Sequence, residues 1–289
     1  MARRDDNAEL PPPAAVPPMP LSRLRAFVNH VPWWLIAIGG LIAWLVTKAL
    51  SNDLYRQILD VVSGGIGVTV FVALVAFAAA TLLGLVVALG LMSRWLVARQ
   101  AARFYCEVIR GVPMLVLLFY IAFVAAPGIV LAANAVLALL HPRGDAPVFE
   151  ARDFSLMWRA IVALVLSYSS FIAEIFRAGF QSVQKGQTDA ARSLGMTSRQ
   201  VFRHVTFPQG LRTILPALGN DFVSMVKDSA LVSVLGVADI TQMAKVYASS
   251  SFTFFETYNV VALVYLVMTL ALSLALRGLE RRLRAHERR

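Results

Sequence analysis

A few ionisable residues stand within long apolar segments, where their types and spacing allow ion pairing or the binding of a charged solute. Glu174 and Arg177 are three residues apart, so on a helix they share one face and can pair. If this segment crosses a membrane, the two residues form a local ion pair, or Arg177 snorkels to the membrane surface, or they are part of an inner gate. Ionisable groups at membrane depth are rare, and they are functional candidates for that reason.

Lys227 and Asp228 are adjacent in a second apolar segment. Neighbouring helical residues point about 100° apart, so each can face a different partner. Such a pair could complement the carboxylate and the ammonium of an α-amino acid, or it could lock two helices together as an ion pair. Asn220, Asp221 and Ser224 lie one to two turns earlier and could line the same path.

The elements that carry these residues follow from composition. The chain has 289 residues, of which 58% are hydrophobic and 15% charged, and its mean hydropathy is +0.67. Soluble domains usually contain about a quarter charged residues. Uncharged runs such as 61–93 and 257–276 are long enough for a helix to cross a hydrocarbon core, which takes ~20 residues. We therefore expect an all-α polytopic membrane protein.

Six membrane spans are predicted, at about residues 31–50, 62–92, 106–140, 155–180, 211–238 and 257–278. The third is too long for one straight helix, and we expect Pro127-Gly128 to end it. The run from Arg110 to Pro113 predicts a helix break. Residues 1–30 are Pro-rich and predicted to be a disordered cytoplasmic tail, residues 51–60 an outer loop, and residues 278–289 a basic cytoplasmic tail.

The Lys and Arg residues predict the orientation in the membrane. With the N-terminus inside, 20 of the 27 Lys and Arg residues fall in or beside cytoplasmic segments. Positive residues concentrate on the cytoplasmic side, so both termini and the loop between the fourth and fifth spans are predicted to be cytoplasmic. We therefore attribute the net charge of +10 to the positive cytoplasmic segments of a membrane protein and not to nucleic-acid binding.

That cytoplasmic loop contains DAARSLGMTSRQVFRHVTFP, which predicts two short helices. The first would begin at Thr188-Asp189 and end at Gly195, where a positive φ is favoured. The second would begin with the capping box of Thr197 and Gln200 and end at Pro208. This elbow is either an interfacial loop that binds anionic lipid or a helix pair gripped by a cytoplasmic protein.

Motifs for catalysis are missing from the sequence. It contains no G-x-x-x-x-G-K-[ST] motif, so this chain is not expected to hydrolyse ATP. It also contains no G-x-S-x-G motif, which carries the nucleophilic serine of α/β-hydrolases. The four histidines are scattered without metal-ligand spacing, and Cys106 is the single cysteine. We expect no enzyme activity, no metal site and no cofactor in this chain.

Three ordered motifs carry a resemblance to a known family. The elbow resembles the E-A-A-x3-G-x9-I-x-L-P loop of ABC-importer permeases, with Asp, Val and Phe replacing Glu, Ile and Leu. The runs IRGVPMLVLLFY, SFIAEIFRAGFQSVQKGQTDAARSLGM and LPALGNDFVSMVKDSALVSVLG are similar to those of the polar-amino-acid branch. Departures from that branch are Val112, Ala178 and Ser229-Ala230. The resemblance extends from about residue 65 to residue 277.

The resemblance implies a type I ABC importer transmembrane domain at residues 65–277, with a five-helix core and one extra N-terminal transmembrane helix. It also implies a bacterial inner-membrane protein that moves a polar amino acid by alternating access. An ABC ATPase dimer, which holds the ATP and Mg, would bind the coupling loop at 186–208. The coupling residues would be Asp189, Ala190, Ala191, Leu194, Gly195, Val201 and Phe202.

Other partners are implied by the same resemblance: a periplasmic or lipid-anchored solute-binding protein, membrane lipid, and either a second copy of this chain or a related permease. Two alternatives stay open. The same architecture could carry another small polar cargo, such as an opine or a sulfur-containing amino-acid analogue. An ion-coupled carrier using Glu174, Lys227 and Asp228 would instead sustain uptake after ATP depletion and lose it with a proton uncoupler.

Overall fold

The computed structural model describes residues 33–140 and 148–285, and every regular element within them is a helix. The chain divides into two units after Trp44, inside α2 (Trp33–Ser51). The predicted tail at 1–30 lies outside the described residues. α2 is helical as expected, but its apolar stretch Ile36–Lys48 is short, so its crossing of a membrane stays a prediction.

Four helical segments among the described residues are long and apolar enough to cross a membrane: Asp53–Leu91, Met114–Leu140, Leu156–Gln181 and Phe254–Gly278. They coincide with the second, third, fourth and sixth predicted spans. The fifth predicted span, at 211–238, is not among these four segments. It consists of α11 (Phe207–Asp228) and a 3-10 helix, η4 (Ser229–Leu235), because polar residues on α11 lower its hydropathy.

Residues 51–60, which we predicted to form an outer loop, belong mainly to a helix, α3 (Asp53–Ser63), and their place outside the membrane stays a prediction. The Asn52 side chain caps α3 by accepting the Leu54 N–H at 2.9 Å. The buried face of α3 packs against α12 (Ile240–Ser251) and α13 (Phe254–Ala285) through Tyr55, Ile58 and Val62. α13 also includes the start of the predicted basic tail, which is therefore helical up to Ala285.

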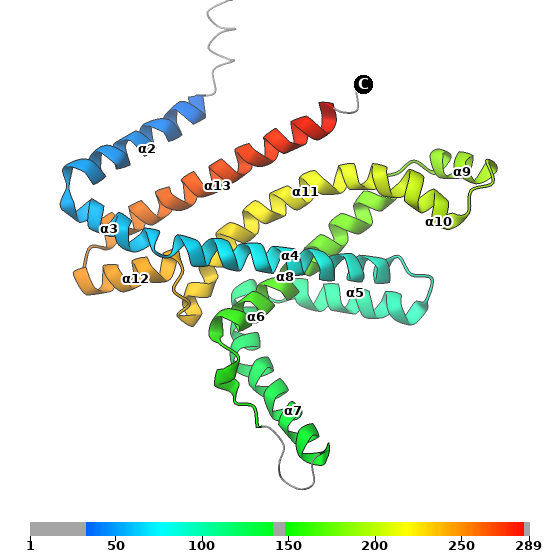
Figure 1. The fold of residues 1–289 in the computed structure, drawn as a ribbon, viewed down its shortest axis with the longest axis horizontal. Coiled ribbons are helices and arrows are strands. Elements are labelled where there is room, and N and C mark those ends of the chain that lie inside the picture. The colour runs from blue at the N-terminus through cyan, green and yellow to red at the C-terminus, as the bar shows by residue number, and fades with distance from the viewer. Residues whose placement is uncertain (1–32, 141–147, 286–289) are drawn as a thin grey trace, which may run out of the picture. The chain divides into compact units, whose positions relative to one another are not determined.

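The packing of α4 (Ile66–Leu91) on α8 (Leu156–Gln181) forms the centre of the main unit (Figure 1). The buried face of α4 is a row of small residues: Ala73, Ala76, Ala80, Gly84 and Ala88. A Cβ at Gly84 would lie 2.7 Å from Cγ2 of Ile172 and 3.0 Å from the Ser169 carbonyl oxygen. Small residues allow this close approach, on which helix association in lipid depends.

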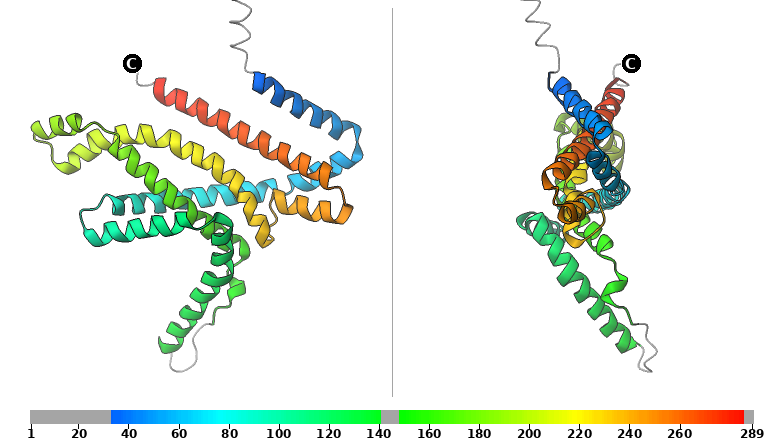
Figure 2. Two further views of the ribbon diagram at one scale, coloured as in Figure 1. Left: turned by 180° about the vertical axis from the view of Figure 1, so that it is seen from behind. Right: turned by 90° about the vertical axis from the view of Figure 1, so that its left-hand side faces the viewer.

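The third predicted span is interrupted at a different place from the one predicted. α5 (Leu96–Gly111) ends before the extended Val112, and Pro113 precedes α6 (Met114–Tyr120), so the predicted break at Arg110–Pro113 is confirmed. Pro127-Gly128 does not end a helix. The chain continues from α6 through the π-helix η1 (Ile121–Ala125) into α7 (Ala126–Leu140), which extends away from α4 and α5 (Figure 2).

A π-turn explains how this helix tolerates its proline. The Ala126 N–H donates to the Ile121 carbonyl, five residues back. In an α-helix, the ring of Pro127 would clash with the carbonyl four residues back. The wider turn removes that contact, so the helix continues through the proline.

Arg159 joins the start of α8 to η1 and to the segment before α8. It is 7% exposed. Its guanidinium donates to the carbonyls of Phe154 (2.8 Å), Ala122 (2.7 Å) and Ala151. These carbonyls lie at interrupted or terminal backbone, where helical hydrogen bonding is incomplete. Arg159 therefore satisfies backbone acceptors that would otherwise be costly to bury.

Replacing Arg159 is expected to destabilise the fold. Arg159→Leu removes the guanidinium that donates to the buried Ala122 carbonyl, so the free energy of unfolding should fall by about 2 kcal/mol or more. Denaturation in detergent measures the change. Arg152→Leu is the control, because Arg152 forms an exposed pair with Glu150 and should have little effect. Equal stability of the two variants would contradict the role assigned to Arg159.

Candidate functional site

A cavity of about 410 Å³ lies where the α5–α6 break, α8 and α11 meet. Its polar side chains come from all three elements, and apolar residues from the break and from α8 complete the wall. The polar lining residues are Arg110, Ser167, Tyr168, Asp221, Ser224 and Asp228. A space of this size, with a few convergent polar groups, is typical of a small-molecule site.

The local structure of each element explains this convergence. Val112 and Pro113 interrupt the helix, so Arg110 and Met114 both reach the cavity although they belong to different helices. On α11, Asp221, Ser224 and Asp228 have the i, i+3, i+7 spacing that places residues on one helical face. The carboxylates of the site are therefore stacked along a single helix.

The two carboxylates have different surroundings. The hydroxyl of the buried Tyr168 donates to Oδ2 of Asp228 at 2.7 Å. Asp221 Oδ2 is buried and accepts no hydrogen bond from the part of the chain that the structure describes. A buried acceptor without a donor is costly. The site therefore offers one anchored carboxylate and one that a polar solute or water can satisfy.

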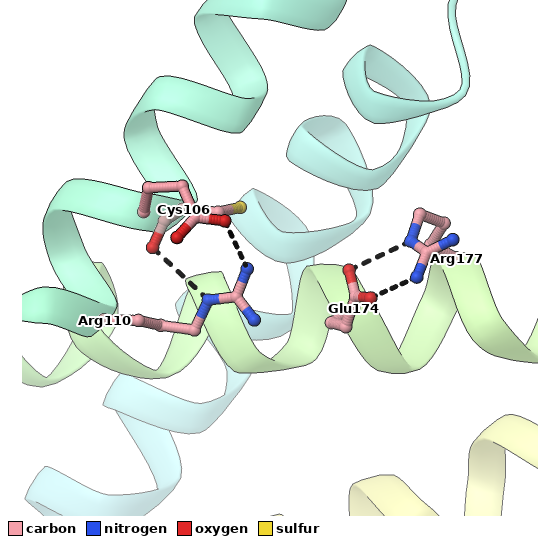
Figure 3. A network of polar contacts seen from close by, with 5 residues as sticks. Cys106, Arg110, Glu174 and Arg177 are labelled. Atoms are coloured by element: carbon pink, nitrogen blue, oxygen red, sulfur yellow. Dashed lines mark hydrogen bonds and ion pairs between the residues drawn. The ribbon is translucent and has the colours of Figure 1, made fainter.

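Arg110, in the last turn of α5, supplies positive charge to the cavity wall. Its Nε donates to the Cys106 carbonyl at 3.3 Å, and its Nη2 lies 3.9 Å from Oε1 of Glu107. Figure 3 shows Arg110 together with Glu174 and Arg177, which form an ion pair on α8. The cavity thus has a guanidinium on one element and carboxylates on another.

The structure brings together only part of the predicted path. Asp221, Ser224 and Asp228 line the cavity, whereas Lys227 and Asn220 are exposed on other faces of α11. The predicted pairing of Glu174 with Arg177 is confirmed, although neither residue lines the cavity. Lys227 and Asp228 do not act as an adjacent pair, because consecutive helical residues diverge by about 100°.

Tyr168 and Arg110 are functional candidates that the analysis of charges in the sequence did not select. Tyr168 lies in an apolar run with hydroxyl residues, LSYSS, and its hydroxyl reaches α11 sixty positions away in the chain. Arg110 directly precedes the Gly-Val-Pro break, which is the signal that could have identified it. Only the tertiary fold shows that both side chains face the same space.

The elbow contains the two predicted helices with shifted boundaries. α9 (Lys185–Ser193) begins before Thr188, so Asp189 lies inside the helix and pairs with Arg192 at 3.7 Å. The predicted capping box of α10 (Ser198–Val201) is confirmed, because the Thr197 N–H donates to Oε1 of Gln200 at 2.8 Å and Oγ1 of Thr197 accepts the Gln200 N–H at 3.4 Å.

Gly195 ends α9 in the predicted left-handed conformation, with φ +80°. Its N–H donates to the Arg192 carbonyl at 2.9 Å, and the Met196 N–H donates to the Ala191 carbonyl at 3.2 Å. This pair of hydrogen bonds is the Schellman arrangement. No atom lies within 4 Å of a Cβ added at Gly195, so this side of the turn is open.

The prediction that Pro208 ends the second helix is wrong. α10 continues through a second π-helix, η3 (Phe202–Thr206), into α11, and the Phe207 N–H donates to the Phe202 carbonyl five residues back. Here too the wide turn comes directly before a proline. The second half of the elbow is therefore continuous with the helix that carries the cavity carboxylates.

The seven predicted coupling residues divide into two groups. Ala191 and Val201 are buried, and they pack within the chain. The others are exposed: Asp189, Ala190, Leu194, Gly195 and Phe202. Leu194, an apolar residue, is 84% exposed at the tip of the elbow. An open glycine beside an exposed leucine is suited to contact with another molecule.

No group of three or more His, Cys, Asp or Glu side chains suited to a metal ion occurs within residues 33–140 and 148–285. Asp228 accepts the Tyr168 hydroxyl, and Oδ2 of Asp221 accepts no hydrogen bond from a described residue. That the chain carries no cofactor stays a prediction.

Comparison with known proteins gives consistent similarities. Residues 80–285 match the family described as "Binding-protein-dependent transport system inner membrane component". The "Probable amino-acid permease protein YxeN" of Bacillus subtilis (strain 168) is 36% identical over 207 residues, covering 72% of this chain and 84% of that protein. The "Glutamine transport system permease protein GlnP" of Escherichia coli (strain K12) is 32% identical, covering 76% and 91%.

Solved structures agree with this comparison. A chain from "an amino acid ABC transporter with histidines" has a TM-score of 0.65 and 37% identity, and the match covers 81% of this chain and 97% of the other. A chain of the MetNI methionine ABC transporter in an inward-facing conformation has a TM-score of 0.59 at 17% identity, covering 78% and 97%. The second similarity concerns the fold alone.

The Schellman turn predicts a local effect of substitution at Gly195. Gly195→Ala places a Cβ in the left-handed region, which costs about 1 kcal/mol. Amide hydrogen exchange of α9 and α10 should become faster, while that of α8 should not change. Gly186→Ala is the matched control, because Gly186 lies inside α9 with open space around it and alanine favours helix. Slower exchange in Gly195→Ala would contradict the assignment.

Proposed function

Because the chain belongs to the family of inner membrane components of binding-protein-dependent transport systems, we propose that it forms the path by which an ATP-driven importer moves a polar amino acid. The chain has the fold of a type I ABC importer transmembrane domain and is a multi-pass inner-membrane permease, not an enzyme. Permeases of this family work with an ATPase and a substrate-binding protein. We propose in addition that the elbow contacts the ATPase and that both termini are cytoplasmic.

The observation that carries the cargo assignment is the charge arrangement of the cavity. Asp221 and Asp228 would accept hydrogen bonds from the ammonium group of an amino acid, and Arg110 would donate to its carboxylate. The hydroxyls of Ser167 and Ser224 are available to a polar side chain. The names of the relatives, which specify amino acids in general and glutamine, favour the same class.

The elbow is the proposed contact with the ATPase. Its exposed residues, from Asp189 to Phe202, would lie on the ATPase surface, and the open side of Gly195 would allow close approach. Ala191 and Val201 would support the elbow from within. ATP and Mg would be bound by the ATPase dimer, and both termini of this chain would be cytoplasmic, as the Lys and Arg distribution favours.

The mechanism follows from the continuity between elbow and cavity. Closure of the ATPase dimer would move the elbow, and α10, η3 and α11 would carry that movement to Asp221 and Asp228. The cavity would then change from facing the solute-binding protein to facing the cytoplasm. The Glu174–Arg177 pair is proposed as an inner gate element, since it lies on α8 between the cavity and the elbow.

The ATPase contact predicts the effect of a bulky anion at the elbow. Gly195→Glu should abolish ATP-dependent uptake of radiolabelled L-glutamine and L-arginine, because the side chain would occupy the space needed by the partner. Ser250→Glu adds the same charge at an exposed position of α12 and should leave uptake unchanged. Undiminished uptake by the Gly195→Glu protein would overturn the docking assignment.

The cavity predicts a substrate-binding effect. Asp221→Asn removes the charge of an acceptor that no described residue satisfies, and a charge-assisted hydrogen bond contributes about 1.5–3 kcal/mol, so the KM for uptake should rise roughly tenfold or more. Lys227→Gln is the control, since Lys227 lies on the same helix outside the cavity. An equal rise of KM in both variants would show that the effect is not local to the cavity.

A further inference from the structure

Two glycines bring α8 and α11 together near the elbow. A Cβ at Gly179 would overlap Cγ1 of Ile214 and lie 3.3 Å from the Gly210 carbonyl oxygen. A Cβ at Gly210 would lie 2.8 Å from Cδ1 of Phe180 and 3.1 Å from the Gly179 carbonyl oxygen. Each glycine is therefore close to the backbone of the other helix, and a larger residue would displace the side chain of Ile214 or Phe180 and press on the facing backbone.

An aromatic cluster reinforces this crossing on the side of the elbow. The ring of Phe180, at the end of α8, lies 5.5 Å from that of Phe202 and 6.3 Å from that of Phe207. Phe202 and Phe207 are themselves 6.0 Å apart. Phe202 belongs to η3 and Phe207 begins α11, so the cluster joins α8 to the elbow and to the next helix.

The same two helices are joined again at the cavity. The hydroxyl of Tyr168 on α8 donates to Asp228 on α11 at 2.7 Å. On α8, Tyr168 lies about three helical turns from Gly179, whereas on α11 Asp228 lies about five turns from Gly210. The crossing and the hydrogen bond thus join the two helices at two separate places, one near the elbow and one at the cavity.

We propose that Gly179 and Gly210 are positioning residues that make α8, the elbow and α11 a single lever between the ATPase contact and the cavity. The inference rests on the proposed function, because a lever has a role only if the elbow is driven. Fixed contact at the crossing prevents α8 and α11 from sliding, so displacement of the elbow reaches Tyr168, Asp221 and Asp228. Without this contact, α11 would move with the elbow but α8 would not follow, so the two walls of the cavity would not rearrange together and access to the cavity would not change.

The test uses the full complex with its ATPase and solute-binding protein in proteoliposomes. Gly179→Ala and Gly210→Ala should each retain ATP hydrolysis and lower L-amino-acid uptake roughly tenfold, the range expected for loss of coupling between sites. Gly67→Ala is the control, since nothing lies within 4 Å of a Cβ at that position. Loss of ATP hydrolysis and uptake in equal proportion would overturn the lever, because general misfolding affects both.

A second-site change separates positioning from ordinary packing damage. Ile214→Ala removes the side-chain atoms that a Cβ at position 179 would meet. The double variant Gly179→Ala with Ile214→Ala should therefore recover coupled uptake relative to Gly179→Ala alone. If Ile214→Ala lowers uptake further in the presence of Gly179→Ala, close contact at the crossing is not the determining feature.

A readout independent of cargo distinguishes failure of the lever from failure of the proposed function. In a Cys106→Ser background, Ser224→Cys places one thiol in the cavity, and its maleimide labelling rate is measured with and without ATP. ATP should change the rate with wild-type glycines and not with Gly179→Ala. A change that persists in Gly179→Ala overturns the lever. An ATP response without uptake of any L-amino acid supports the lever and overturns the cargo.

Discussion

Close approach of helix backbones through small residues is the constraint on which the main unit depends. In lipid, apolar side chains gain little by leaving one hydrocarbon environment for another, so helices are held by dense packing and by interhelical hydrogen bonds. The small residues of α4 allow it to lie directly against Ile172 and Ser169 of α8, and Gly179 and Gly210 repeat the same solution where α8 crosses α11. α8 is thereby the shared partner of both contacts, and its cavity-lining residues, Ser167, Tyr168 and Phe171, lie beside the residues that contact α4.

Interruptions of the helices create the site, and each needs a way to satisfy backbone groups. Val112 and Pro113 break the helix beside the cavity, and the side chain of Arg110 returns to the Cys106 carbonyl one turn earlier. At the π-helix before Pro127, the carbonyl of Ala122 accepts a hydrogen bond from the side chain of Arg159. Exposed backbone is costly in a membrane, so irregular segments occur where side chains can replace the missing bonds.

Much of the fold could be predicted from the sequence, because long uncharged runs, positive residues and capping patterns act locally. The elbow illustrates this: Gly195 and the Thr197–Gln200 box have the predicted geometry. The site was predicted only in part. Asp221 and Asp228 were identified by charge, but Tyr168 was not, since its role depends on α11 lying opposite. The sequence does not reveal α3, because Asp53, Arg56 and Asp60 interrupt its apolar pattern. It also predicts helix ends at Pro127 and Pro208, because π-turns have no clear sequence signal.

The π-helix η3 has a consequence for the phase of the helix that follows it. A π-turn accommodates one residue more than an α-turn, and one residue corresponds to a rotation of about 100°. The direction in which Asp221, Ser224 and Asp228 point around the axis of α11 therefore depends on the number of residues in the preceding segment Phe202–Thr206. A chain one residue shorter there would keep the same carboxylates in the same helix but direct them toward a different neighbour, so the composition of the cavity is encoded partly by residue count in a segment that never reaches it.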